Sequence, residues 1–295
     1  MANYPVEVRI LPLQRINSPF RLYQEGFFIY IQPIRPRSYS NFPFRDPNCH
    51  FLAYFCRFMG QKKLHRFAEV LTFPNVLQYP ENMPGNWKTF FKNDNPITLE
   101  LACGKGEYAV GLGRLFPDRN FLGVDVKGNR IWVGAKKALQ ENLTNVGFLR
   151  TQIDRIGTYF SPGEVSEIWL TFPDPQLRTS KARRRLTHPK FLRWYQQIMR
   201  PGGYIHLKTD SPNLYRFTKW VIELYDLPVI QDVEDVYGEE KVSDVLQIKT
   251  HYESLDIAQS NKVHYLQFML PATPLPDKES ALKLLLLEEE SDRRS

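Results

Sequence analysis

The sequence predicts an α/β protein with a mostly parallel sheet that has helices on both faces. From residue 96 onward, short apolar runs rich in Ile, Val and Phe alternate with longer amphipathic segments, as in repeated strand-helix units. The first junction of this kind contains two glycines, Gly104 and Gly106, and the next apolar run ends in an acid, Asp125. Ligands of such folds bind at the carboxyl ends of the strands, so we search those ends for a site.

The expected elements follow in chain order. Strands are predicted at 97–102, 120–125, 146–149, 167–172, 204–208 and 264–270, and helices at 108–116, 130–143, 189–199 and 214–225. The helix over 130–143 shows the pattern clearly, because Ile131, Ala135 and Ala138 fall on one face.

Composition divides the 295-residue chain at Met59. Residues 1–58 contain no Lys, whereas all 17 Lys lie in 59–295. We expect 1–58 to be an atypical extension, either an appended segment such as an aromatic docking arm or upstream sequence from a mis-assigned start. An N-terminal arm over 59–95, a main α/β domain over 96–271 and a C-terminal tail over 272–295 complete the predicted organisation. The tail is expected to be a peripheral helix or a frayed end.

Composition also excludes several classes of protein. A hydrophobic content of 42% with 24% charged residues is typical of a globular protein. No apolar run approaches the roughly 18 residues that a membrane helix needs. Cys49, Cys56 and Cys103 form no disulfide framework, and the histidines show no metal-ligand spacing. We therefore expect a cytoplasmic protein with no metal and no membrane association, either a monomer or a homodimer.

The first strand end has the features of a nucleoside pocket. Gly104 and Gly106 allow a ligand to approach the backbone, and Asp125 can accept both hydroxyls of a ribose. A dinucleotide fingerprint would need a third glycine where Ala109 stands. Glu100 would repel a pyrophosphate but attract a cationic ligand. These residues favour S-adenosylmethionine, which carries a sulfonium, an amine and a ribose but no phosphate.

A later strand end carries an acid beside a basic run. Asp174 lies between Pro173 and Pro175, which hold it in a stiff loop. The stretch 176–193 then contains seven basic residues and no acid: Arg178, Lys181, Arg183, Arg184, Arg185, Lys190 and Arg193. Beside a strand-end site this cluster favours contacts with the phosphates of a nucleic acid over a merely solvated face.

Four motifs in this order resemble those of a known family. They are a strand-end Glu followed by Gly-x-Gly, Phe-Pro-Asp-Pro leading into Arg-Arg-Leu, Lys-Thr-Asp, and Thr-x-Tyr-Glu. Together they resemble bacterial tRNA (guanine-N7)-methyltransferases, over roughly residues 59–271. The resemblance implies a class I (Rossmann-like) S-adenosylmethionine-dependent methyltransferase fold with a mostly parallel seven-stranded sheet. It also implies tRNA as partner and methylation of a guanine in the variable loop, forming 7-methylguanosine.

The resemblance assigns roles to particular positions. Cofactor binding is expected from Glu100, Gly104, Gly106, Asp125 and Asp174, with Gln152 or Asp154 at the adenine. Asp174 is expected to be the active-site acid. Contacts with the substrate are expected from Arg178, Asp210, Thr250, His251, Tyr252 and Glu253. Contacts with tRNA phosphates are expected from Lys181, Arg183, Arg184 and Arg185. The chain departs from the family at Ala102, which replaces a glycine, at Gln176, which replaces a Trp, at Arg178, which replaces a Lys, and at Lys181, where a His is common.

The expected chemistry requires positioning and no base. Guanine N7 presents a lone pair in the ring plane, so nothing has to be deprotonated before it attacks a methyl group. We expect Asp174, with Asp210 or Glu253, to accept hydrogen bonds from guanine N1 and N2. Two alternatives stay open: a class I methyltransferase acting on another RNA or on a small molecule, and a non-catalytic RNA-binding protein with this fold.

Overall fold

The structure is a computed structural model, and it describes residues 6–9, 22–24, 27–33, 61–255 and 259–292. Contacts divide the chain into two units, Met1–Phe55 and Cys56–Ser295. The first contains a three-stranded antiparallel sheet in the order β1 (Val6–Arg9), β3 (Phe27–Pro33), β2 (Leu22–Gln24). The question of a mis-assigned start lies outside the described residues, and the predicted boundaries at 58, 95 and 271 stay predictions.

The second unit is built on an eight-stranded sheet. Its order is β10 (Val229–Val233), β11 (His264–Met269), β9 (Met199–Thr209), β8 (Val165–Thr171), β5 (Ile97–Leu101), β6 (Asn120–Asp125), β7 (Val146–Arg150) and β4 (Val76–Gln78). All strands are parallel except β11, which runs antiparallel to both neighbours. The predicted fold class is confirmed. The sheet has one strand more than the seven that the resemblance implies, and β4 and β10 are the two strands missing from the six ranges predicted along the chain.

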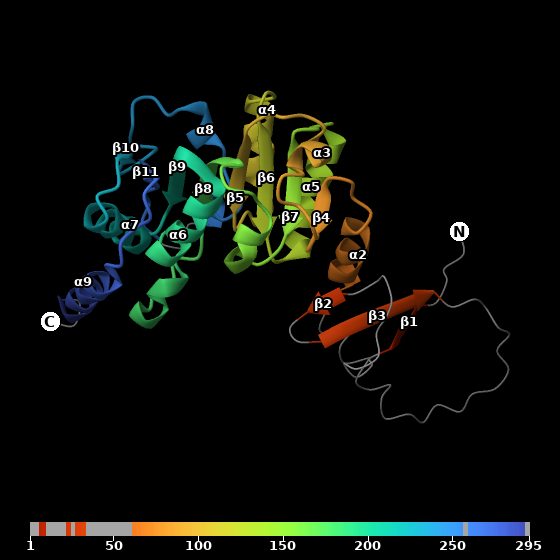
Figure 1. The fold of residues 1–295 in the computed structure, drawn as a ribbon, viewed down its shortest axis with the longest axis horizontal. Coiled ribbons are helices and arrows are strands. Elements are labelled where there is room, and N and C mark those ends of the chain that lie inside the picture. Colours follow the sequence, from red (N-terminus) through yellow and green to blue (C-terminus); the bar gives the residue numbers. More distant parts are fainter. Residues whose placement is uncertain (1–5, 10–21, 25–26, 34–60, 256–258, 293–295) are drawn as a thin grey trace. The chain divides into compact units, whose positions relative to one another are not determined.

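Helices cover both faces of this sheet (Figure 1). One face carries α4 (Glu107–Leu115), α5 (Gly128–Gln140) and the short α8 (Asp244–Gln247), with α2 (Gln61–Val70) packed on α5. The other carries α3 (Trp87–Phe91), α6 (Pro189–Ile198), α7 (Pro212–Leu224) and α9 (Glu279–Asp292). Alternation along β8 shows the two cores, because Ile168 and Leu170 face one layer and Trp169 the other.

The strand order reverses at β5. Its neighbours are β6, which follows it along the chain, and β8, which is the third strand after it. Loops that leave β5 and β8 therefore diverge to opposite faces and open a crevice at the carboxyl edge of the sheet. The predicted strand-end residues all lie along this edge.

Two predicted strands end one residue early for the same physical reason. The backbone turns into the left-handed region at Ala102, with a φ of 56°, and at Phe172, with a φ of 46°. A strand cannot continue through such a residue. Strand β10 was not predicted, because Val229 and Ile230 are exposed on this edge strand and show no alternation.

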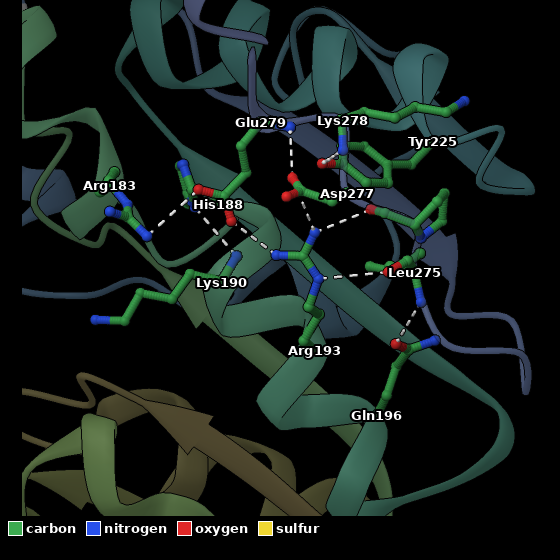
Figure 2. A network of polar contacts seen from close by, with 11 residues as sticks. Arg183, His188, Lys190, Arg193, Gln196, Tyr225, Leu275, Asp277, Lys278 and Glu279 are labelled. Atoms are coloured by element: carbon green, nitrogen blue, oxygen red, sulfur yellow. Dashed lines mark hydrogen bonds and ion pairs between the residues drawn. The ribbon is translucent and has the colours of Figure 1, made fainter. Parts of the chain in front are cut away.

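The C-terminal tail is docked on α6 and α7. Leu282 and Leu286 of α9 are buried in the core. Figure 2 shows Arg193 of α6 at the centre of the contact: it donates to the carbonyls of Leu275 and Pro276 and lies 2.7 Å from Glu279. The expected peripheral helix is therefore an integral part of this face.

Gly134 allows α5 to pack against the turn that follows β5. A Cβ here would lie 2.5 Å from the Lys105 carbonyl oxygen and 2.8 Å from Phe148 Cζ. We expect Gly134→Ala to lower the free energy of unfolding by about 1–3 kcal/mol, although Ala is the better helix former. Gly157→Ala is the control, because its nearest neighbour would be 3.5 Å away. Urea unfolding measures both, and equal changes would contradict the prediction.

Candidate active site

The turn between β5 and α4 consists largely of left-handed residues. Ala102, Gly104 and Gly106 have φ values of 56°, 55° and 70°. Glycine adopts this conformation freely, whereas Ala102 carries a strain of about 1–2 kcal/mol. Gly106 is required for a second reason, since a Cβ would come within 2.4 Å of Phe148. The turn is therefore a tight backbone surface at the switch point of the sheet.

Asp125 closes this turn from the end of β6. One carboxylate oxygen accepts a hydrogen bond from the Gly104 amide at 3.0 Å, and the other accepts from the Lys127 amide at 2.7 Å. The side chain is largely buried but lies directly beside the glycines, as the sequence predicted. Two oxygens with further lone pairs are thus presented at the adjoining strand end.

Glu100 lies beneath the turn and is only 3% exposed. Its carboxyl oxygens accept from the Ala109 amide and from the Thr171 hydroxyl, both at 2.8 Å. Burial raises the pKa of Glu100 from its ordinary value to about 8. The residue expected to face a cationic ligand therefore also ties β5 to the start of α4 and to the end of β8.

Asp174 lies in a strained loop that leaves β8. Phe172 and Gln176 on either side of it both have a φ of 46°. The Phe172 amide donates to the Lys208 carbonyl at 2.8 Å, and the Gln176 amide donates to Asp174 Oδ1 at 3.0 Å. Asp174 itself is exposed. The loop thus presents a carboxylate at the crevice in a defined conformation.

The basic run does not point in one direction. Arg178, Lys181, Arg183 and Arg184 are exposed on or beside the 3-10 helix η2 (Thr179–Arg184), and Arg183 lies 3.4 Å from Glu279 of the tail. Arg185 is instead buried at 3% exposure. Its guanidinium donates to the carbonyls of Pro175 at 3.1 Å and Gln176 at 3.2 Å. This placement favours support of the Asp174 loop over the phosphate contact predicted for Arg185.

Both candidates for the adenine contact follow β7. Gln152 and Asp154 are exposed at the beginning of the 3-10 helix η1 (Ile153–Thr158). One oxygen of Asp154 lies 3.9 Å from the Lys190 ammonium. The choice between the two residues stays open.

The predicted substrate segment, residues 250–253, reaches the glycine turn. A Cβ on Gly104 would lie 3.1 Å from Tyr252 Cε2, so the Tyr252 ring covers this part of the turn. The Arg130 guanidinium lies 5.4 Å from the centre of the same ring. Thr250 is buried and His251 exposed, while Asp210 follows β9 and accepts at its carbonyl from the Ser260 hydroxyl. The structure therefore brings the Thr-x-Tyr-Glu motif to the glycine turn.

Glu253 has a partner that sequence reasoning did not identify. The Lys208 ammonium lies 3.2 Å from Glu253 Oε2, and the Tyr237 hydroxyl donates to Oε1. Lys208 has no exposed side-chain surface. The one available signal was that Lys208 opens the Lys-Thr-Asp motif, near the end of strand β9.

Other features lie apart from this crevice. A cavity of about 480 Å³ opens between α4, α5 and α8; Gly106 of the turn lines it, but neither Asp125 nor Asp174 does. Within the described ranges, no group of three or more His, Cys, Asp or Glu is placed to hold a metal ion. No helix in the same part of the chain is long and apolar enough to cross a membrane.

The fold, the glycine turn and the strand-end acids together define a class I methyltransferase. A family described as "Putative methyltransferase" matches residues 94–266. The tRNA (guanine-N(7)-)-methyltransferase of Bacteroides fragilis is 50% identical, with 72% of this chain and 87% of the relative covered. The protein of that name from Christiangramia forsetii is 43% identical, with 72% and 100% covered. The chain belongs to the tRNA (guanine-N7)-methyltransferase family, which confirms the resemblance.

The raised pKa of Glu100 gives a testable pH dependence. The folded state keeps a proton that the unfolded state loses between pH 4.5 and about 8. The free energy of unfolding therefore falls as pH rises through this window, by at most about 1.4 kcal/mol per pH unit for one group. Glu100→Gln cannot titrate, so we expect its melting temperature, relative to wild type, to rise with pH. Glu239→Gln, at an exposed position, is the control, and a Glu100→Gln difference independent of pH would refute this assignment.

Proposed function

We propose that this chain transfers the methyl group of S-adenosylmethionine to N7 of a guanine in the variable loop of tRNA, forming 7-methylguanosine. One observation carries the proposal beyond family membership. Asp174 is exposed in a braced loop at the switch point, and the exposed cations of η2 follow it directly. A carboxylate that can bind the edge of a nucleobase thus lies beside cations that can bind the phosphate backbone.

The residues around the turn fit S-adenosylmethionine. Gly104 offers backbone without a side chain, and Asp125 has lone pairs for the ribose hydroxyls. Glu107 and Asp125 place carboxyl groups at the turn, which disfavours a pyrophosphate and favours a sulfonium and an ammonium. An approaching cation would also lower the pKa of Glu100 and draw out its charged form. When bound, the cofactor supplies a methyl group activated by the positive sulfur.

The chain's own residues then have to align and orient the target. Attack on the methyl carbon needs N7, carbon and sulfur in line, and holding that geometry is the main contribution of the protein. Asp174 would accept hydrogen bonds from guanine N1 and N2 and stabilise the positive charge that spreads through the purine. Adenine lacks this pair of donors, so the same contact would select against it.

The burial of the basic residues supports two different tasks. Arg178, Lys181 and Arg184 are exposed and suit contacts with tRNA phosphates, which release counterions and so make binding salt-dependent. Arg185 donates to the carbonyls of Pro175 and Gln176, the two residues that follow Asp174, and so fixes this part of the loop. Because the Glu253 carboxylate is already bonded to Lys208 and Tyr237, Asp174 is the better supported acid for the guanine.

The activity can be tested with purified protein, unmodified tRNA and labelled S-adenosylmethionine. We expect 7-methylguanosine as the labelled nucleoside. Asp174→Ala should lower turnover by about 100-fold or more while cofactor affinity in calorimetry stays within about threefold. Asp118→Ala, an exposed acid after α4, is the control. A different labelled nucleoside would assign another acceptor, and a protein that binds tRNA but no cofactor would be an RNA-binding module.

Adjacent arginines provide a matched pair. Arg184→Gln should weaken tRNA binding and reduce the slope of log K against log salt by about one, since it removes a phosphate contact. Arg185→Gln should leave that slope unchanged but lower kcat by at least about tenfold, because the Asp174 loop loses its support. Binding across a salt series and single-turnover methylation separate the two. The opposite pattern would place Arg185, and not Arg184, on the phosphate.

A further inference from the structure

Lys208 is a fully buried lysine at the end of β9. Its ammonium donates to the carbonyls of Leu246 at 2.8 Å and Ile248 at 3.1 Å. It also donates to Glu253 Oε2 at 3.2 Å, and the Tyr237 hydroxyl lies 3.4 Å away. The side chain has no exposed surface, and that of Glu253 is only 7% exposed. All four partners lie within 237–253, the stretch that ends in the Thr-x-Tyr-Glu motif.

Aromatic rings surround the same ammonium. The ring centres of Tyr108, Phe172 and Tyr237 lie 5.4, 5.6 and 5.6 Å from it, within the range of cation–π attraction. Burial lowers the pKa of Lys208, and the Glu253 charge opposes this effect. A buried ion pair generally adds little stability compared with apolar residues of the same volume. A role in positioning explains a charge here better than stability does.

The backbone of Lys208 reaches the other half of the site. Its carbonyl accepts from the Phe172 amide at 2.8 Å, at the point where the Asp174 loop leaves β8. One residue therefore holds the Asp174 loop through its carbonyl and the substrate segment through its ammonium. Lys208 therefore fixes the distance between the Asp174 loop and the substrate segment.

Both oxygens of the Glu253 carboxylate already accept hydrogen bonds from groups within the chain. Oε1 accepts from Tyr237, and Oε2 accepts from Lys208 and, at 3.3 Å, from the Thr250 amide. The Glu253 amide in turn donates to Thr250 Oγ1 at 3.1 Å. These contacts fold the segment so that Tyr252 lies against Gly104.

We propose that Lys208 is the positioning residue of the substrate segment, that Glu253 is its internal counter-ion, and that Tyr252 is the side chain this segment presents beside the cofactor turn. This inference rests on the proposed methyl transfer to tRNA, and it revises the direct guanine contact expected for Glu253. Because Glu100 and Asp125 are held by separate bonds, the cofactor turn does not depend on Lys208.

The first test is Lys208→Met, which keeps length and apolar volume but removes the charge. Hydrogen–deuterium exchange without tRNA should become at least about tenfold faster over residues 244–255. The kcat/KM for tRNA should fall at least about tenfold, while the dissociation constant for S-adenosylmethionine changes less than about threefold. Lys262→Met is the control, because Lys262 pairs with Glu234 at 2.9 Å on the surface and contacts none of this network.

The second test separates a counter-ion from a substrate ligand. In Lys208→Met/Glu253→Gln no uncompensated carboxylate remains, so kcat/KM should recover relative to Lys208→Met alone. If Glu253 binds guanine directly, Glu253→Gln will cost as much activity in the Lys208→Met background as in wild type, and the inference is overturned. Tyr237→Phe, which removes one exposed hydroxyl, should give a smaller loss that is not additive with Glu253→Gln.

The inference can still be tested if Lys208→Met does not fold or if the wild-type protein does not methylate tRNA. Should Lys208→Met not fold, non-additivity between Tyr237→Phe and Glu253→Gln decides, and additive losses overturn the inference. Exchange over 244–255 is measured without substrate. If the wild-type protein does not methylate tRNA, the proposed function fails while the exchange result still stands, and unchanged exchange in Lys208→Met refutes the positioning role whatever the substrate is.

Discussion

The buried carboxyl of Glu100 is the contact on which the geometry of the site depends. It joins the first turn of α4, through the Ala109 amide, to the last residue of β8, through the Thr171 hydroxyl. The next residue, Phe172, donates to the Lys208 carbonyl, and the Lys208 ammonium reaches Glu253. Three polar links in series thus connect the cofactor turn, the Asp174 loop and the substrate segment. Each link is buried and has little room to relax, while the glycine turn keeps its own bonds through Glu100 and Asp125.

Charge is divided between the two sides of the crevice. Carboxyl groups gather at the glycine turn, whereas the exposed cations follow the Asp174 loop. This division suits a cationic cofactor and a polyanionic substrate in adjoining positions. The basic run of the sequence reaches this surface only in part, since Arg185 supports the loop from within and Arg193 holds the C-terminal tail.

Local sequence was sufficient for the fold class and for the residues at strand ends. Apolar alternation fixes most strands, and Glu100, Asp125 and Asp174 stand out because each follows or ends one. Lys208 could not be assigned in this way, because its partners lie 29 to 45 residues further along the chain. Arg184 and Arg185 look equivalent in sequence, yet the end of a 3-10 helix directs one outward and the other inward. Strands β4 and β10 were missed, since edge strands need bury little apolar surface.

Four residues that break local rules lie together at the site. Ala102, Phe172 and Gln176 adopt left-handed conformations that glycine would adopt without strain, and Lys208 places a charge in an apolar core. Such residues persist only where surrounding contacts determine their conformation. Here those contacts are the Asp125 bond to Gly104, the Lys208 bond to Phe172 and the Arg185 fork on the loop carbonyls. A methyl transfer without a base depends on the alignment of the reacting groups. The strained residues lower the stability of the fold, but they hold the groups that provide this alignment.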